Sequence, residues 1–234
     1  MKAKFQEVYD LIEIDIRDGV YSETRKLLSE DEYVNRYGVS RDTVRAAIDL
    51  LITRGYCYPV QGKGVFLRRQ IFAGATNLEN TRGLTRDLYP QKITSKIVAF
   101  EQISAEGSIA ANMNCAVGTP LTHYERIRYA DGKPVCIESL YFFAAMVPMT
   151  LEILEGSVYE YMRSTLKINL LMIDHVIQAI KLDPREAAFL ELNPGDPGLC
   201  FENLGMDRKG DIVQFGLTIN HYQRIRCLKM ASYL

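Results

Sequence analysis

The stretch YVNRYGVSRDTVRAAIDLLITRG, residues 33–55, determines the fold of the first part of the chain. Apolar residues in its second half recur at helical spacing, namely Val44, Ala47, Ile48 and Leu51. Ser40 is a favourable N-cap for this helix, and Gly55 is a typical terminator. Gly38 ends the preceding helix and supplies a tight turn. Two helices joined in this way form a helix-turn-helix.

The flanking segments extend this motif. An amphipathic pattern predicts a first helix, with apolar residues at Phe5, Tyr9, Ile12 and Ile16. Ser29, followed three residues later by Glu32, forms a capping box that opens the second helix. Residues 56–60 and 65–67 predict two short strands around the glycine-rich turn Gln61-Gly62-Lys63-Gly64. Three helices and a hairpin predict a winged helix-turn-helix over residues 1–69.

Two arginines, Arg41 and Arg45, lie one turn apart on the predicted third helix and off its apolar stripe. The chain has a formal net charge of −1, yet residues 36–69 carry seven Lys and Arg against two Asp. These basic side chains have three possible roles: they are simply solvated, they form ion pairs within the protein, or they bind an anionic partner. Charge alone favours the solvated surface. The position at the start of the second helix of the motif favours contacts with base edges in the major groove.

The segment LLSEDEYVNRYGVSRDTVRAAIDLLITRGYCYPVQGKGVFL, residues 27–67, resembles the DNA-binding domain of GntR-family transcription regulators. The cap, the turn, the arginine pair and the wing all match in order. The resemblance implies that Arg41 and Arg45 read bases. It also implies supporting DNA contacts from Ser40, Thr43, Gly62, Lys63 and Gly64. Two residues depart from the family pattern: Leu28 replaces a proline, and Asp31 stands where the family often has a DNA-contacting arginine.

The rest of the chain contains a faint internal repeat. Gly118-Thr119-Pro120 and Glu125 recur 77 residues later as Gly195-Asp196-Pro197 and Glu202, each unit following a short helix and leading into a hairpin. A duplicated unit predicts a pseudo-symmetric antiparallel sheet with a pocket between its halves; a chance likeness of two loops is the alternative. Residues 70–83 are polar and lack periodicity, which predicts a linker.

Residues from about Thr85 to the C-terminus resemble the UTRA effector-binding domain of the HutC subgroup, which shares its fold with chorismate lyase. The match is strongest in HYERIRYADGKPVCIESLYF, residues 123–142. The resemblance implies that Arg126 and Arg128 hold the anionic group of a sugar phosphate and that Glu138 binds sugar hydroxyls. It assigns further effector contacts to Thr85, Ser157, Tyr159 and Gln214. The predicted domain, residues 84–234, is of mixed α/β type with an antiparallel sheet, so the whole chain is α+β.

Several observations bear on this predicted site. Gln214 and Asn220 stand where the family often presents an acid and a tyrosine, and Gly83 where serine is common. Arginines two residues apart on a strand share one face of the sheet, and guanidinium pairs suit phosphate. From spacing alone, cross-strand surface ion pairs among Arg126, Arg128 and Glu138 are the simpler interpretation. The resemblance favours the effector site.

The remaining composition narrows the class of protein. Five widely spaced cysteines and three histidines show no metal-ligand spacing, so we expect reduced thiols, no metal and no cofactor. The acid-rich start and the lack of a long apolar run predict a cytoplasmic protein without a membrane span. We therefore predict a homodimeric regulator, a repressor that leaves its double-stranded operator when a small anionic effector binds. The alternatives are a chorismate-lyase-like enzyme and a partner-binding adaptor.

Overall fold

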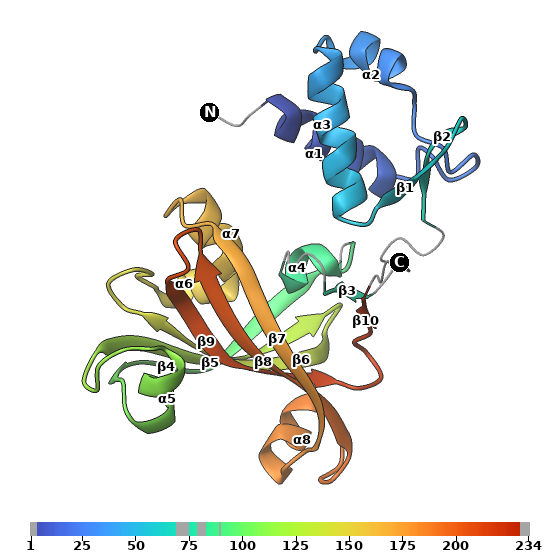
Figure 1. The fold of residues 1–234 in the computed structure, drawn as a ribbon. Coiled ribbons are helices and arrows are strands. Elements are labelled where there is room, and N and C mark those ends of the chain that lie inside the picture. The colour runs from blue at the N-terminus through green and yellow to red at the C-terminus, as the bar shows by residue number, and fades with distance from the viewer. Residues whose placement is uncertain (1–3, 69–74, 79–82, 89, 230–234) are drawn as a thin grey trace. The chain divides into compact units, whose positions relative to one another are not determined.

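Figure 1 shows the fold in a computed structural model, which describes residues 4–68, 75–78, 83–88 and 90–229. The chain divides into two compact units, built mainly from Met1–Ala73 and from Thr81–Cys227. The predicted linker, residues 70–83, lies mostly outside the described residues. Within it, β3 (Thr76–Asn77) pairs with β10 (Cys227–Leu228).

The described part of the first unit contains the elements that the sequence predicts. They are α1 (Lys4–Arg17), α2 (Glu30–Tyr37), α3 (Arg41–Thr53), β1 (Cys57–Val60) and β2 (Gly64–Leu67). Ser29 and Glu32 form the capping box of α2, and the Ser40 side chain accepts a hydrogen bond from the Thr43 amide at 3.3 Å at the start of α3. Gly38 has φ 64°, a left-handed conformation that lets the chain turn sharply between the two helices. The winged helix-turn-helix is confirmed.

The core of this unit forms where apolar stripes of the helices meet. Ile12 of α1, Tyr33 of α2 and Leu51 of α3 are completely buried in one cluster. Burying one such side chain contributes about 1.5–3 kcal/mol. Because the stripe of α3 is used in this core, its opposite face remains for polar side chains.

The second unit is built on a six-stranded antiparallel sheet with strand order β4-β5-β6-β9-β8-β7. The strands are β4 (Ile93–Ser104), β5 (Pro120–Ala130), β6 (Lys133–Phe143), β7 (Leu170–Lys181), β8 (Pro197–Asp207) and β9 (Ile212–His221). The predicted α+β class, with an antiparallel sheet in the C-terminal domain, is confirmed.

The sheet is a duplication, as the internal repeat predicts. The elements β4, α5 (Gly107–Asn112) and β5 recur as β7, α8 (Pro184–Leu190) and β8, and each recurring element begins 77 residues after its counterpart. The two halves join where β6 pairs with β9. At this join Gly216 is required, because a Cβ there would overlap the backbone of Ser139 and Leu140. The offset found in two loops therefore extends through two of the three strands in each half of the sheet and through the helix between them.

Helices lie on both faces of the sheet (Figure 1). On one face, α8 packs against Ile137 of β6 and Ile219 of β9. On the other face, α6 (Leu151–Glu155) and α7 (Val158–Ser164) pack against Tyr124 of β5 and Leu140 of β6. Side chains alternate along a strand, so the residues at even positions of β5 and β6 face α6 and α7. The predicted effector residues Arg126, Arg128 and Glu138 belong to this set.

Candidate functional sites

The exposed face of α3 presents the two predicted DNA-reading arginines. Arg45 donates to both carboxylate oxygens of Glu30, from Nε at 3.1 Å and from Nη2 at 2.9 Å. Arg41 lies 2.6 Å from Asp31, and both of these side chains are more than half exposed. Exposed ion pairs contribute little to stability. These pairs therefore orient the two arginines but are easily broken when another partner binds. A phosphate or a base edge can replace these carboxylates as the partner.

The other predicted DNA contacts lie on α3 and on the wing. The Ser40 and Thr43 hydroxyls are 2.9 Å apart in the first turn of α3. Gly62 and Gly64 have positive φ in the turn between β1 and β2, and Lys63 is exposed at its tip. A Cβ on Gly64 would lie 3.1 Å from Cε of Lys26, which places a second cation beside the wing. Lys26 was not predicted, because it lies outside the wing sequence and reaches it through a bridge to Phe66.

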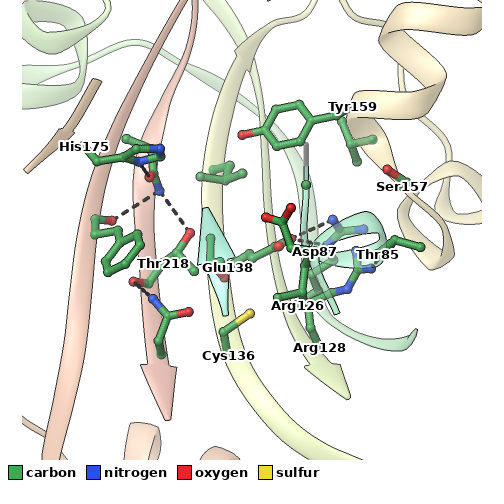
Figure 2. A pocket seen from close by; sticks show the side chains of 18 of the residues that line it. Thr85, Asp87, Arg126, Arg128, Cys136, Glu138, Ser157, Tyr159, His175 and Thr218 are labelled. Carbon is green, nitrogen blue, oxygen red and sulfur yellow. Dashed lines mark hydrogen bonds and ion pairs between the residues drawn. The ribbon is translucent and has the colours of Figure 1, made fainter. Parts of the chain in front are cut away.

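A pocket in the second unit brings together most of the predicted effector residues (Figure 2). Arg126 and Arg128 come from β5, Glu138 from β6, and Thr85 from the short helix α4 (Leu84–Asp87). Ser157 and Tyr159 line it from the start of α7, where Ser157 is the N-cap. Gln214 is completely buried and is not part of the lining; it donates to the Tyr159 hydroxyl at 3.0 Å.

Arg126 and Glu138 form a buried ion pair across β5 and β6. Nε and Nη2 of Arg126 both lie 2.6 Å from one carboxylate oxygen of Glu138, and Nη1 donates to the carbonyls of Leu154 and Gly156. Burial disfavours both charges, but the mutual attraction raises the pKa of Arg126 and lowers the pKa of Glu138. The simpler interpretation from spacing was a cross-strand ion pair on the surface. The pair does join two strands, but it is not on the surface, because Arg126 is only 3% exposed.

Arg128 is less completely paired. It donates to the Gly156 carbonyl and to the Thr85 hydroxyl, each at 3.1 Å. Its Nε is buried and has no hydrogen-bond partner among the described residues. Burial, with a contribution from Arg126, lowers the pKa of this guanidinium. An acceptor that bears negative charge would satisfy the unused donor and stabilise the cation.

The lining also contains polar residues that the sequence did not predict as site residues. Asp87 of α4 is a buried carboxylate, so two carboxylates accompany the two arginines. On the other side, the lining includes His175, Asn203, Thr218 and Asn220 from the second half of the sheet. The pocket therefore spans both halves, as the duplication predicts. The relevant signal was the 77-residue offset, which places Asn203 at the position equivalent to Arg126.

Among the residues that the structure describes, no group of His, Cys, Asp and Glu is placed to hold a metal ion. Within the same residues, no helix is long and apolar enough to cross a membrane.

Comparison with known proteins matches both units to families. The profile described as "Bacterial regulatory proteins, gntR family" matches residues 4–67, and the UTRA domain profile matches residues 89–226. The HTH-type transcriptional regulator YydK of Bacillus subtilis, named as uncharacterized, is 26% identical over 230 residues, 98% of each chain. A probable fructoselysine utilization operon transcriptional repressor of Escherichia coli K12 is 28% identical over 83% of this chain and 80% of its own.

A solved structure agrees with the fold. The crystal structure of the possible transcriptional regulator YydK from Bacillus subtilis matches with a TM-score of 0.82 and 23% identity, covering 99% of this chain and 100% of that one. The relatives are named as regulators, which favours a regulator over the lyase-like enzyme and the adaptor.

Proposed function

Because the chain belongs to the gntR family of bacterial regulatory proteins and carries a UTRA domain, we propose that it is a ligand-released repressor. Its winged helix-turn-helix binds a two-fold DNA operator, and a small anionic metabolite such as a sugar phosphate binds the pocket of the UTRA domain. The name of the Escherichia coli relative, a probable repressor of a utilization operon for a sugar derivative, supports this direction of control.

One observation carries the effector assignment: the buried Nε of Arg128 has no hydrogen-bond partner among the described residues, and it lies in a pocket lined by residues from eight helices and strands. Leaving a buried donor unsatisfied costs about 1–3 kcal/mol, and more for a charged group. An anionic ligand removes this cost. Thr85 contacts the same guanidinium, and Ser157 and Tyr159 add further hydroxyl groups to the pocket lining.

The DNA side of the proposal uses the exposed face of α3 and the wing. Arg41 and Arg45 exchange their carboxylate partners for guanine edges, for which a guanidinium is suited. Lys63 at the wing tip contacts the phosphate backbone. One winged helix-turn-helix covers few base pairs, so specificity requires a homodimer on a two-fold site.

Ligand binding affects DNA affinity only if the ligand prefers one arrangement of the heads. Thr85 lies in the single turn of α4, which directly follows the predicted linker, and it accepts a hydrogen bond from Arg128. An anion at Arg128 competes for this bond, so the start of α4 responds to the ligand. We expect the response to change the spacing of the two heads and to weaken operator binding by about 5- to 150-fold.

The test begins with a thermal-shift screen that compares sugar phosphates with the same sugars without phosphate. A specific ligand raises the melting temperature by mass action. The effector found is then added to an operator selected from a random DNA library, and affinity is measured by fluorescence anisotropy. Arg128→Gln should abolish the response to the effector, whereas Arg163→Gln, which removes a half-buried arginine paired with Glu160 outside the pocket lining, should retain it. Stabilisation by neutral or cationic compounds alone would contradict the effector class, and unchanged operator affinity would contradict the coupling.

A further inference from the structure

Two acids occupy consecutive positions at the start of α2, within contact of the first turns of α3 (Figure 1). Glu30 accepts hydrogen bonds from two nitrogens of Arg45, and its side chain is 36% exposed. Oδ1 of Asp31 lies 2.6 Å from Nη2 of Arg41, and the Asp31 side chain is 63% exposed. An ion pair that is more exposed to solvent is exchanged more readily. Asp31 is therefore the carboxylate that a new partner of Arg41 displaces easily.

The position of Asp31 places it on the surface that the proposed function assigns to DNA. Arg41 is the first residue of α3 and lies off the stripe that packs in the core. The two helices are held together by buried side chains of one cluster, among them Tyr33 of α2 and Val44 of α3. Because this packing fixes the backbone of Asp31 beside α3, its carboxylate stays close to Arg41 when the arginine reaches a base edge.

A carboxylate in the major groove has narrow requirements. An ionised Asp accepts hydrogen bonds and donates none. Guanine and thymine present acceptors to it, and adenine places the acceptor N7 beside its amino group. Cytosine presents the N4 amino group, which donates, so it is the base that suits a carboxylate. When Arg41 exchanges Asp31 for a guanine, a cytosine amino group restores a partner to the released carboxylate.

This exchange leaves each of the two charges with a base as its partner. We propose that Asp31 is a specificity-determining residue, which accepts a hydrogen bond from N4 of a cytosine in a base pair next to the guanine that Arg41 binds. Any other base at this position leaves the carboxylate without a partner or facing an acceptor, and this costs affinity. The inference rests on the proposed function and adds one base pair to each half of its operator.

The test is a binding selection from a random DNA library with the full-length wild type, Asp31→Ala and Asp31→Asn. Affinities for the selected operators, and for operators with single substitutions, are then measured by fluorescence anisotropy. Glu7→Gln is the matched control, because Glu7 is an exposed acid in the first turn of α1, outside the helix-turn-helix. It changes the charge of the protein and of a helix start in the same way as Asp31→Asn. Melting temperatures show that each variant is folded.

The expected pattern is confined to one position of each half-site. For the wild type and Glu7→Gln, replacing the cytosine should weaken binding about ten-fold. Asp31→Ala should bind all four bases there within about two-fold, and Asp31→Asn should prefer adenine, which suits an amide. An operator without a preferred cytosine, or an unchanged preference in Asp31→Ala, would overturn the role of Asp31 alone. Unchanged affinity and base preference in Arg41→Ala would contradict the DNA-reading role of α3 in the proposed function, and the role of Asp31 with it.

Discussion

Glu138→Gln is the most informative single change in the UTRA domain, because it removes one charge from a buried pair and preserves the shape of the side chain. In the wild type, Glu138 is the carboxylate partner of Arg126, whose side chain is 4% exposed. Removing one partner of a buried pair costs about 3–5 kcal/mol, because the remaining charge is left without compensation. The Glu138 side chain is 13% exposed, so solvent in the pocket reduces the effect, and we expect about 3 kcal/mol.

This cost translates into a measurable melting shift. For a domain of about 150 residues, 1 kcal/mol corresponds to about 2–4 °C, so the variant should melt about 6–12 °C below the wild type at pH 7. The arginines lower the pKa of Glu138, so its contribution is present above the ordinary carboxyl pKa and is lost as the pH falls through the lowered value. The difference between variant and wild type should therefore shrink in acid.

The same change should act in the opposite direction on ligand binding. Without Glu138, the charge of Arg126 is available to a ligand, and anions should bind about ten-fold more tightly or better. Inorganic phosphate should then stabilise the variant more than the wild type in a thermal-shift assay. Glu191→Gln is the matched control, since Glu191 is 61% exposed and lies 3.5 Å from Arg224. An unchanged melting temperature, or a weaker response to phosphate, would refute the assignment of Glu138 as the counter-charge of the pocket.

Further predictions concern DNA binding, backbone packing and pH. Arg45→Ala should cost about 1–3 kcal/mol per half-site and relax base preference in a binding selection, and Lys63→Ala should lower affinity evenly across sequences and flatten its salt dependence. Gly216→Ala should lower the free energy of unfolding by at least about 2 kcal/mol in urea denaturation, while Gly156→Ala, whose Cβ would meet an ordinary 3.7 Å contact, should stay within about 0.5 kcal/mol. Burial lowers the pKa of His175, so the unfolded chain takes up its proton first; stability should fall as the pH drops below about 6.5, and less steeply in His175→Phe.

The sequence predicted the elements whose signals are local. Ser29 and Ser40 mark helix starts by their own side-chain chemistry, and Gly38 marks a turn that needs a left-handed residue. The alternation of β5 placed Arg126 and Arg128 on one face without knowledge of any neighbour. Each of these features depends on only a few consecutive residues, and for this reason the structure contains all of them.

Other features depend on contacts that spacing does not encode. The partners of Arg41 and Arg45 are Asp31 and Glu30, which lie on another helix across the turn, beyond the reach of the i, i+4 rule. Strand β7 was not predicted, because it is an edge strand whose exposed positions include Leu171, Met172 and Val176, so apolar and polar residues do not alternate. His175 was missed with it.

Gln214 was predicted as an effector contact from the family resemblance, but the structure places it outside the pocket lining. Family members often contact the ligand from this position. Here the Gln214 side chain packs against Gly205, and its amide nitrogen donates a hydrogen bond to the Tyr159 hydroxyl. Its Oε1 is buried and has no hydrogen-bond partner within the described residues, which leaves an unused acceptor next to the pocket. A tyrosine that binds a ligand can rotate its hydroxyl, and the Gln214 amide can then exchange that bond for one to the ligand. The second half of the sheet therefore carries the uncharged contacts, and the first half carries the charge. A ligand that satisfied both Arg128 Nε and Gln214 Oε1 would have to combine a negatively charged acceptor with a hydrogen-bond donor.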